Sequence, residues 1–395
     1  KRALKLSKSL SRAVPKSPVP LNIAGIALTG LNKPADSLSY FKKAIAIEPG
    51  FHDARKNAAQ ALVSMGKPDK ALQWLEVPKK QTPGDPVVWY LMTQCRMGLN
   101  QPDKAMEAVN TVIDLQPGQA RGYFLRARVF LQIGYLRDAI SDLEKVLEID
   151  PSNIAAMTEI SLPLARQLRS DEALAVVEKA VSLRPDASPA RLRLASQLVE
   201  TGRGPEAVLQ YQEVLKSDHG NAFALESLVE LLDGDDVAGL EEAAMRALKS
   251  APRRSEERAT LQYALYRILQ KSNDPARAAR HLADANRDMA LILPYDYATD
   301  RGLTETLLNR FSVAGAKASD TGDKPVPVFI VGLPRSGTTL AEAVLGAHPD
   351  VAALGEQGTA GALLAPLINE NRPFDDAAIL EFRSQFERQR PDLPD

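Results

Sequence analysis

Five prolines lie 34 residues apart in the first half of the chain, and this spacing constrains the fold more than any other feature. They are Pro49, Pro83, Pro117, Pro151 and Pro185. A second series has the same interval: Ala71, Ala105, Ala139, Ala173 and Ala207. Two residue types that keep a common phase over five units indicate an internal repeat, in which each unit packs mainly against its neighbours.

The residue types within one unit predict two antiparallel helices joined by a short turn. A glycine precedes three of the alanines by five residues, where the turn needs backbone angles that glycine tolerates. The alanine lies where the second helix crosses the first, and the proline ends the second helix because it has no N–H group. The glycines are Gly66, Gly134 and Gly202. The large residues expected in the core of the second helix are Phe41, Leu75, Leu143, Val177 and Tyr211.

Composition favours stacked helices over a sheet-rich fold, because hydrophobic residues make up 45% of the chain but aromatic residues only 5%. The net charge of −1 gives no electrostatic reason to expect a nucleic-acid partner. No apolar run approaches the roughly 18 residues that a membrane-spanning helix needs, so no transmembrane segment is expected. Cys95 is the only cysteine, which fits a reducing compartment and predicts a cytoplasmic location. The sequence does not predict the oligomeric state.

In period, order and residue types the units resemble the tetratricopeptide repeat, and Trp89 and Tyr123 take its first aromatic position. We expect about seven such repeats over residues 18–253, then a divergent helical repeat and a linker over 254–322. Residues 1–17 form a basic leader with no acidic residue before Asp36. This leader is either a solvated terminus or a transit-like or membrane-surface segment.

The resemblance implies a superhelix whose concave groove is lined by the first helix of each unit. On the family pattern, five side chains project toward this groove and would bind a protein or peptide. They are Lys56, Tyr90, Gln94, Arg121 and Arg128. The alternative is that these side chains are solvated residues on the surface of a spacer.

The character of the sequence changes after Asp320. The apolar run Pro327–Val331 predicts a short buried strand, the segment 332–339 is a glycine loop, and a helical apolar pattern begins at Leu340. Strand, glycine loop and helix in this order are the context of a phosphate-binding motif. The alternative is an ordinary tight turn.

The loop predicts which groups hold the anion. The N–H groups of Ser336, Gly337, Thr338 and Thr339 are expected to point toward it, aided by the helix dipole. A nucleotide kinase or ATPase loop would have lysine where Thr338 stands, whereas the cation here is Arg335. This difference disfavours ordinary ATP chemistry and leaves an unusual P-loop kinase as an alternative.

The string from Pro334 to Thr339 resembles the 5′-phosphosulfate loop of sulfotransferases, which use 3′-phosphoadenosine 5′-phosphosulfate (PAPS). The longer stretch Pro334–Glu356 resembles tyrosylprotein sulfotransferases and bacterial relatives that carry repeats. This resemblance implies a multidomain protein: an all-α tetratricopeptide-repeat superhelix followed by an α/β, P-loop-like sulfotransferase domain. The opening part of that domain would occupy residues 323–395.

The resemblance also implies roles for single residues. Arg335 would contact the phosphosulfate, residues 336–339 would hold the phosphate, and Glu356 would accept the proton of the acceptor hydroxyl, with no metal required. The stretch Leu354–Gln357 departs from the family pattern of two successive acids, which leaves the acceptor open between tyrosine and other hydroxyls. For Glu356, an ordinary surface carboxylate is the alternative. Because family members bind the 3′-phosphate with residues farther along than Asp395, a protein-interaction scaffold with an incomplete catalytic domain is the second functional hypothesis.

Overall fold

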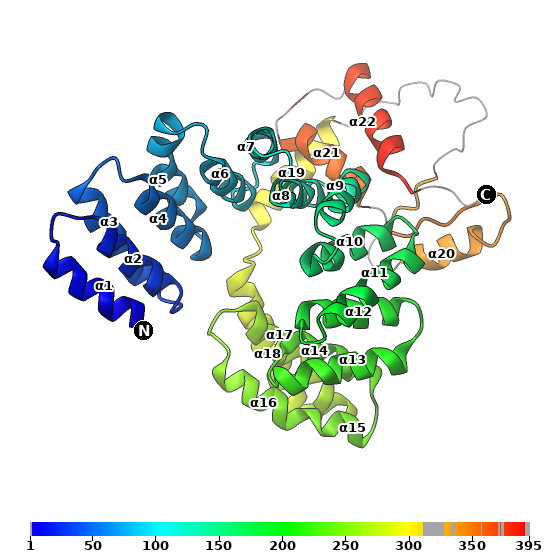
Figure 1. The fold of residues 1–395 in the computed structure, drawn as a ribbon. Helices are drawn as coiled ribbons and strands as arrows, with labels where there is room; N and C mark the ends of the chain where they lie inside the picture. The colour runs from blue at the N-terminus through cyan, green and yellow to red at the C-terminus, as the bar shows by residue number, and fades with distance from the viewer. Residues whose placement is uncertain are drawn as a thin grey trace. The chain divides into compact units, whose positions relative to one another are not determined.

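The computed structural model of the chain describes residues 2–310, 328–332, 336–356, 358–369, 372 and 375–391. Within these ranges the regular secondary structure is helical, from α1 to α22, and no strand is formed (Figure 1). The chain divides into two compact units, Lys1–Ala156 and Met157–Asp395.

In the first unit, α1 (Arg2–Ala13) is followed by four helix pairs, and each pair occupies one 34-residue repeat. The pairs are α2 (Val19–Thr29) with α3 (Pro34–Ile47), α4 (His52–Ser64) with α5 (Pro68–Gln81), α6 (Pro86–Gly98) with α7 (Pro102–Leu115), and α8 (Ala120–Gln132) with α9 (Leu136–Ile149). Each first helix packs on its own second helix, and α2, α4 and α6 also pack on the first helix of the next pair. This arrangement gives a continuous stack with a shared core.

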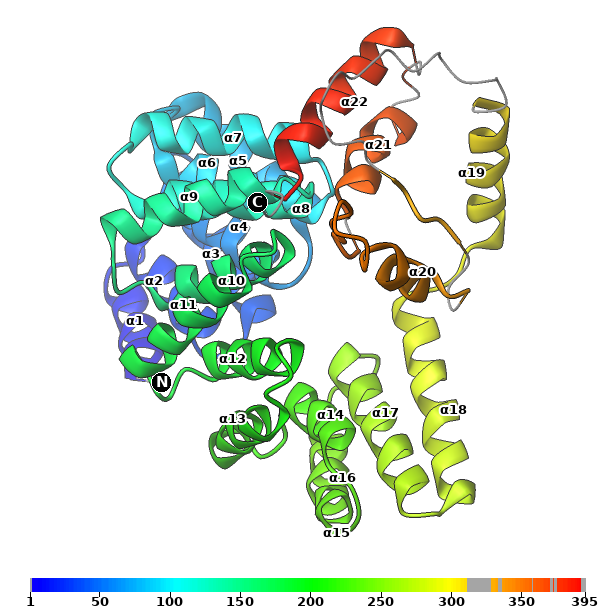
Figure 2. The same cartoon turned by 90° about the vertical axis from the view of Figure 1, so that its right-hand side faces the viewer.

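The second unit continues the pairs, and the unit boundary falls within α10. Its paired helices are α10 (Ile154–Arg166) with α11 (Ser170–Leu183), α12 (Ser188–Glu200) with α13 (Gly204–Ser217), and α17 (Glu256–Lys271) with α18 (Pro275–Ile292). Between them lie α14 (Ala222–Leu231), α15 (Asp235–Ala238) and α16 (Leu240–Ser250). The last helices are α19 (Tyr297–Arg310), α20 (Thr338–Leu345), α21 (Thr359–Asn369) and α22 (Asp376–Gln389). Figures 1 and 2 both show α17 and α18 side by side.

The residues predicted to pack the repeat are buried. The five alanines at the helix crossings are all 0% exposed: Ala71, Ala105, Ala139, Ala173 and Ala207. The large residues of the second helices are 0–2% exposed: Phe41, Leu75, Leu143, Val177 and Tyr211. Full burial of one such side chain contributes roughly 1.5–3 kcal/mol. The ladder of large and small residues is therefore a main source of the stability of the stack.

The first helices carry a small residue of their own, which the sequence analysis missed. At Gly25 a Cβ atom would lie 2.4 Å from the Phe41 ring, so the pair α2–α3 needs glycine there. The later first helices have other small residues at the same repeat position, each 0% exposed: Ala59, Thr93, Ala127, Ser161 and Ala195. Their 34-residue interval is the signal that identifies them.

One residue in the turn of each of the six regular pairs has a left-handed backbone conformation. It is Asn32, Gly66, Asn100, Gly134, Leu168 or Gly202, with φ between 52° and 75°. The predicted role of the three glycines is confirmed. The other three were missed because only glycine was sought, although the interval marks them equally well. Leucine is an unfavourable residue for this conformation because its Cβ crowds the backbone.

The second helices end two residues before the repeat prolines, as predicted. The carbonyl of the proline then accepts a hydrogen bond from a side chain six residues later, at the start of the next first helix. The donors are Arg55 Nη2 to Pro49 (3.3 Å), Trp89 Nε1 to Pro83 (2.7 Å), Tyr123 Oη to Pro117 (3.1 Å) and Arg191 Nε to Pro185 (2.6 Å). The first aromatic position therefore also fastens one repeat to the next.

The strand predicted at Pro327–Val331 is not formed in the described part of this segment. Val328 is 75% and Val331 is 87% exposed, and the segment has no strand partner among the described residues. A strand requires ladder hydrogen bonds from a neighbouring strand, so the apolar run alone does not produce one. The α/β prediction for this end of the chain is therefore wrong for the described residues, which are helical or irregular. The helix predicted after the glycine loop is present as α20.

Candidate functional site

The glycine loop leads into the N-terminus of α20. Gly337 is the N-cap residue with φ 91°, and no side chain caps the helix. The first N–H groups of α20, those of Thr338 and Thr339 among them, are therefore not satisfied by a side-chain cap. Such a terminus offers N–H donors and the positive end of the helix dipole to an anion. Arg335, the predicted cation, lies outside the described residues.

The loop closes tightly upon itself at Gly332. A Cβ atom on this residue would lie 2.4 Å from Ser336 Oγ and 3.0 Å from Thr338 Cγ2. Any other residue at position 332 would therefore displace the side chains at the start of α20. Ser336 and Thr339 are exposed and Thr338 is half-buried, so their hydroxyl groups lie at the surface beside the helix terminus.

The segment that carries Glu356 is tied to the same helix. Glu342, in α20, accepts a hydrogen bond from the Gly355 N–H, with 2.6 Å between Oε1 and N. A second close approach lies beside it, because a Cβ on Gly346 would lie 2.9 Å from the Ala353 Cβ. Glu356 follows directly and is exposed. The sequence analysis did not identify Glu342, since an acidic residue inside a helix carries no motif.

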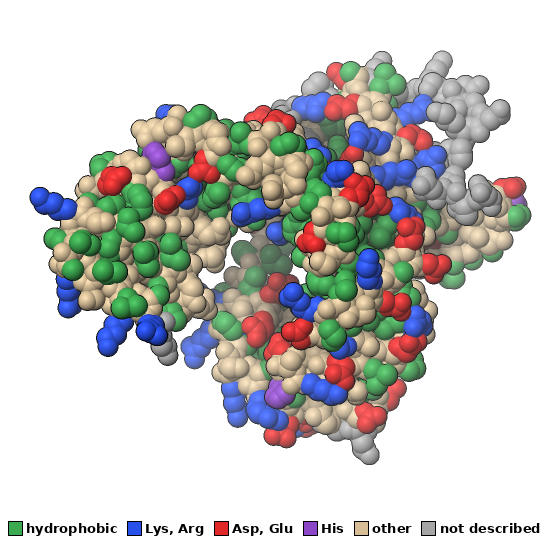
Figure 3. Space-filling model, in the orientation of Figure 1, with side chains coloured by type: hydrophobic (Ala, Val, Ile, Leu, Met, Phe, Trp, Pro, Cys, Tyr) green, Lys and Arg blue, Asp and Glu red, His purple; other side chains and the backbone are tan. Residues whose placement is uncertain are grey.

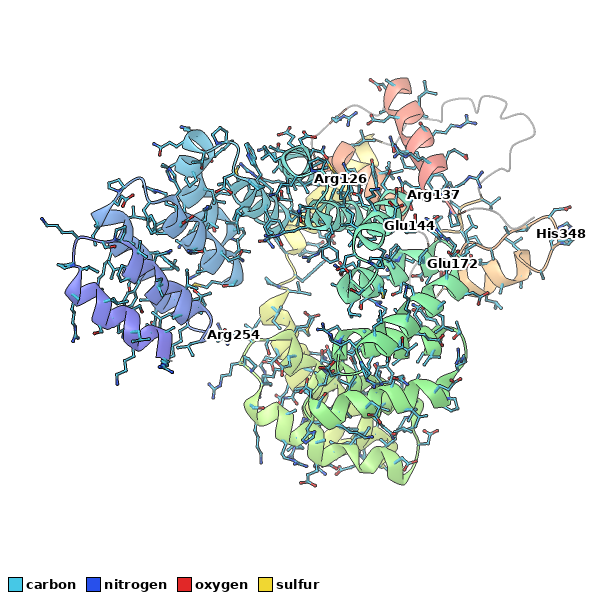
Figure 4. All side chains as sticks on the ribbon, in the orientation of Figure 1. Arg126, Arg137, Glu144, Glu172, Arg254 and His348 are labelled. Carbon is cyan, nitrogen blue, oxygen red and sulfur yellow. The ribbon has the colours of Figure 1, made fainter. Side chains whose placement is uncertain are left out.

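His348 and Cys95 are two further side chains with potentially reactive chemistry. His348 lies in the turn after α20 with 63% of its side chain exposed, and its Nδ1 accepts a hydrogen bond from the Asp350 N–H at 3.2 Å (Figure 4). His348 therefore stabilises the turn after α20 through this hydrogen bond. Cys95 is 0% exposed, and burial raises the pKa of its thiol to about 12. It therefore stays protonated and unreactive at neutral pH.

Three of the predicted groove residues contact one another in the first unit. The Arg121 guanidinium carbon lies 3.6 Å from the centre of the Tyr90 ring, and Gln94 Nε2 donates a hydrogen bond to Tyr90 Oη at 3.2 Å. The Oε1 atom of Gln94 is buried and accepts no hydrogen bond from the described residues. We call these three residues the Tyr90 cluster. Arg128 is exposed on α8, the same helix that carries Arg121 near its start.

Lys56, the remaining predicted groove residue, is engaged in ion pairs. Its Nζ lies 2.6 Å from Asp85 and 2.9 Å from Asp53, and its side chain is 17% exposed. Burial lowers the pKa of Lys56, but the hydrogen bonds and charges of both aspartates outweigh this effect and leave the pKa raised. Since Asp85 also caps α6 through the Val87 N–H, Lys56 fastens α4 to the start of α6.

A buried ion pair in the repeats was not predicted. Arg126 donates two hydrogen bonds to the Asp142 carboxylate, both at 2.7 Å, and a third to Asn110 at 3.2 Å. The Asp142 side chain is 8% exposed. The planar guanidinium matches the carboxylate in two-point contact, which joins α8 to α9. No ligand role is needed to explain these charges.

Comparisons with known protein families match both the repeat region and the segment that contains the glycine loop. Residues 28–95, 120–153 and 163–222 match tetratricopeptide repeat families, and residues 327–389 match the sulfotransferase family. The chain combines tetratricopeptide repeats with a sulfotransferase-like segment. The predicted combination of tetratricopeptide repeats with a sulfotransferase-like segment is therefore confirmed.

Individual relatives are more distant. An uncharacterised protein of Aquifex aeolicus (strain VF5) is 31% identical over 103 residues, which are 26% of this chain and 14% of that protein. A thermophilic tetratricopeptide repeat protein of Thermus thermophilus is 20% identical with a TM-score of 0.42, over 46% of this chain and 100% of that one. A repeat protein of Parabacteroides merdae ATCC 43184 is 15% identical with a TM-score of 0.46, over 73% and 97%.

Two further features are absent from the described residues. None of the helices in the described ranges is both long and apolar enough to cross a membrane. The same ranges contain no group of three or more histidine, cysteine, aspartate or glutamate side chains that could hold a metal ion.

Proposed function

We propose that this protein is a PAPS-dependent sulfotransferase that transfers a sulfuryl group to a hydroxyl of a protein or peptide bound by the repeats. The observation that carries the proposal is the match of residues 327–389 to the sulfotransferase family. The local geometry supports it, because an uncapped helix N-terminus follows the glycine loop inside the matched segment. Tetratricopeptide repeats are surfaces for protein interaction, which supports a protein or peptide as the acceptor.

On the donor side, the first N–H groups of α20 and the hydroxyls of Thr338 and Thr339 would hold the 5′-phosphate of PAPS. Arg335 would bind the sulfuryl oxygens, since a guanidinium can grip two oxygen atoms at once. The acceptor oxygen attacks sulfur while the bond from sulfur to the phosphate oxygen breaks. The leaving group is 3′-phosphoadenosine 5′-phosphate, and charge that spreads over the sulfuryl oxygens is stabilised by these donors.

On the acceptor side, Glu356 would accept the proton of the attacking hydroxyl. A tyrosine phenol has a pKa near 10, so at neutral pH a base close to it speeds the reaction. The hydrogen bond from Gly355 to Glu342 supports this role because it fixes the residue before Glu356 to the helix of the anion loop. Tyrosine is the acceptor that the resemblance to tyrosylprotein sulfotransferases favours.

The Tyr90 cluster is the proposed binding site for the acceptor chain. Gln94 Oε1 is buried without a partner among the described residues, and an unsatisfied acceptor of this kind is costly until a donor reaches it. A peptide N–H group is such a donor. Arg121, which is exposed and stacked on Tyr90, adds a cation that attracts acidic residues of the acceptor. Arg128 would extend this positive surface along α8.

The test is transfer of labelled sulfate from PAPS to tyrosine-containing peptides and proteins. Glu356→Gln keeps the shape of the side chain but removes the base, so turnover should fall roughly 10²–10⁴-fold with little change in nucleotide affinity. Asp350→Asn, an exposed neutral substitution in the same loop, is the matched control and should keep the wild-type rate. Wild-type turnover by Glu356→Gln would disprove its role as the base.

The second candidate function is a protein-interaction scaffold. The observation in its favour is that α20 buries none of its residues, and that the apolar residues Val328–Val331, which precede the loop in the sequence, are exposed. In a scaffold, the Tyr90 cluster would bind its partner while no PAPS is consumed. Peptide binding that depends on Arg121, without any sulfate transfer, would support the scaffold and contradict the enzyme.

A further inference from the structure

Large hydrophobic side chains are exposed along α1, α2 and the turn between them. They are 40–55% exposed: Leu6, Leu10, Val14, Val19, Ile23 and Ile26. From α3 to α18, by contrast, no helix exposes more than one large hydrophobic side chain among its described residues. Exposed apolar side chains are ordinary when they are scattered singly, so it is their concentration on α1 and α2 that needs an explanation.

The spacing of these six residues places them on one side of each helix. In the order given, the first three follow one another at intervals of four residues, and the last three at intervals of four and three. Residues three or four apart lie on the same face of a helix. The two helices pack against each other, and Figure 3 shows hydrophobic side chains gathered over both. We call the six residues the apolar face of α1 and α2.

The charged residues of α1 and of the turn after it are all basic. Each of them is exposed: Arg2, Lys5, Lys8, Arg12 and Lys16. Three of them, Lys5, Lys8 and Arg12, are three and four residues apart, so they share a face of α1 that differs from that of the exposed leucines. The first acidic residue of the chain is Asp36, in α3. Figure 3 shows Lys and Arg side chains along the edge of the hydrophobic surface, and α1 is therefore an amphipathic helix with a basic face.

The residue types of this surface favour a lipid bilayer over a protein partner. Protein–protein interfaces are enriched in aromatic residues and methionine and are depleted of lysine. The sequences of α1 and α2 contain no aromatic residue and no methionine, whereas lysines predominate among the cations. Aliphatic side chains on one face and Lys and Arg on the other are typical of helices that lie in the membrane interface. The uniform positive charge of the segment is complementary to anionic headgroups.

We propose that the apolar face of α1 and α2 docks on the surface of an anionic lipid bilayer. Its aliphatic side chains enter the boundary between headgroups and acyl chains, and the cations of α1 attract the negative charges of the lipids. An α-helix is about 10–12 Å across, close to the Debye length at physiological salt, so cations on the basic face of α1 also contribute. Lys8 contributes least, because it lies over the Tyr40 ring at 5.8 Å and is directed toward α3.

Co-sedimentation of the 395-residue chain with vesicles tests the proposal. The chain should bind vesicles of phosphatidylcholine and phosphatidylserine roughly tenfold more tightly than vesicles of phosphatidylcholine alone, and added salt should weaken this binding. The double variant Leu10→Ser, Ile23→Ser removes two aliphatic side chains and should bind roughly tenfold more weakly. Leu115→Ser, at an exposed apolar position of α7, is the matched control and should bind as the wild type does.

The contribution of charge is measured with a second pair of variants. The double variant Lys5→Gln, Arg12→Gln removes two cations of α1, and the loss should be roughly fivefold in affinity for each. The double variant Lys67→Gln, Lys104→Gln removes the same charge from exposed positions elsewhere in the first unit and should leave binding unchanged. All the changed side chains are exposed, so the fold should be kept, which circular dichroism verifies.

A fluorescent label at position 10 shows whether the apolar face itself enters the lipid. Because Cys95 is buried, an environment-sensitive fluorophore reacts with the introduced cysteine of Leu10→Cys. Vesicles with phosphatidylserine should shift its emission to the blue and should leave that of labelled Leu115→Cys unchanged.

The proposal is overturned if the wild-type chain does not bind the anionic vesicles, if the double variant Leu10→Ser, Ile23→Ser binds them equally well, or if the two labels respond alike. It is also overturned if the chain self-associates through this face without binding lipid, with the association lost in the same double variant. A second copy of the chain would then be the occupant.

Discussion

The carboxylate of Glu342 accepts a hydrogen bond from the Gly355 N–H, with 2.6 Å between the two atoms. This bond links the middle of α20, the helix that begins at the anion loop, to the residue before Glu356. Gly355 has φ 67°, a conformation that glycine adopts without strain, so the chain can turn sharply at this point. The candidate phosphate-binding and base residues therefore belong to one local arrangement.

Removing this bond should loosen the segment that carries Glu356. In Glu342→Ala the Gly355 N–H loses its acceptor, and a net loss of about 1 kcal/mol corresponds to roughly fivefold faster exchange of that amide. Glu342→Gln keeps an oxygen acceptor and should give a smaller change. Hydrogen exchange measured by NMR gives the rates. Equal exchange in all three proteins would mean that the bond does not hold the segment.

Leu168→Gly should stabilise the repeats. Leu168 has φ 62°, in a turn where three other repeats have glycine, and its side chain is 46% exposed, so little packing is lost. Relief of the left-handed strain is worth about 1 kcal/mol after the greater chain entropy of glycine is allowed for. Thermal unfolding measures the change, and Gly134→Leu should act in the opposite direction. A destabilised Leu168→Gly protein would show that the turn carries no strain.

Enlarging a crossing alanine should be costly. Ala105 is 0% exposed, and leucine in its place would force helices α6 and α7 apart, with a loss of about 1–3 kcal/mol. The neighbouring Lys104 is exposed, so Lys104→Leu is the matched control and should change stability by less than about 0.5 kcal/mol. Urea unfolding of the two variants provides the comparison. Similar losses in both would argue that the alanine is not a packing residue.

Stability around α17 and α18 should fall in mild acid. Burial lowers the pKa of His281, whose Nδ1 lies 2.5 Å from the buried Gln262 Oε1. The unfolded chain then binds a proton more readily than the folded one. The contribution of neutral His281 to the free energy of unfolding is therefore complete above the ordinary histidine pKa of about 6.5, and it is lost as the pH falls below that value. Thermal midpoints at pH 7.5 and 5.5 should differ less in His281→Asn than in the wild type; an equal difference would exclude His281 as the cause.

The repeat was predictable because proline, alanine and glycine recur at a fixed interval, and each of them suits a particular place in a pair of antiparallel helices. In the repeat, Pro83 and its equivalents follow a helix end, and Ala105 and its equivalents lie at a helix crossing, so their common spacing predicted the pairs. The left-handed turn at Leu168 was missed because only glycine was sought at this position, and leucine is an unfavourable residue for that conformation. Ion pairs such as Arg126 with Asp142 have no sequence motif, since their partners lie on different helices.

The predictions for the end of the chain depended more on context. The helix after the glycine loop formed as expected because its signal is local. The strand predicted at Pro327–Val331 is not formed in the described residues 328–331, because a strand is stabilised by partners elsewhere in the chain. The hydrogen bond of Glu342 was not predicted for a similar reason, because it forms only when the chain folds back and brings Gly355 to α20.

Calorimetric titration with 3′-phosphoadenosine 5′-phosphate tests the central claim most directly. If the loop before α20 binds the nucleotide of PAPS, the full-length wild-type protein should bind it, and Arg335→Ala in that protein should weaken binding roughly 10²–10³-fold because it removes the cation of the loop. Arg388→Ala removes the same charge from an exposed position in α22 and should bind as the wild type does. If the wild-type protein does not bind the nucleotide, or if both variants bind equally well, the proposed sulfotransferase function is contradicted.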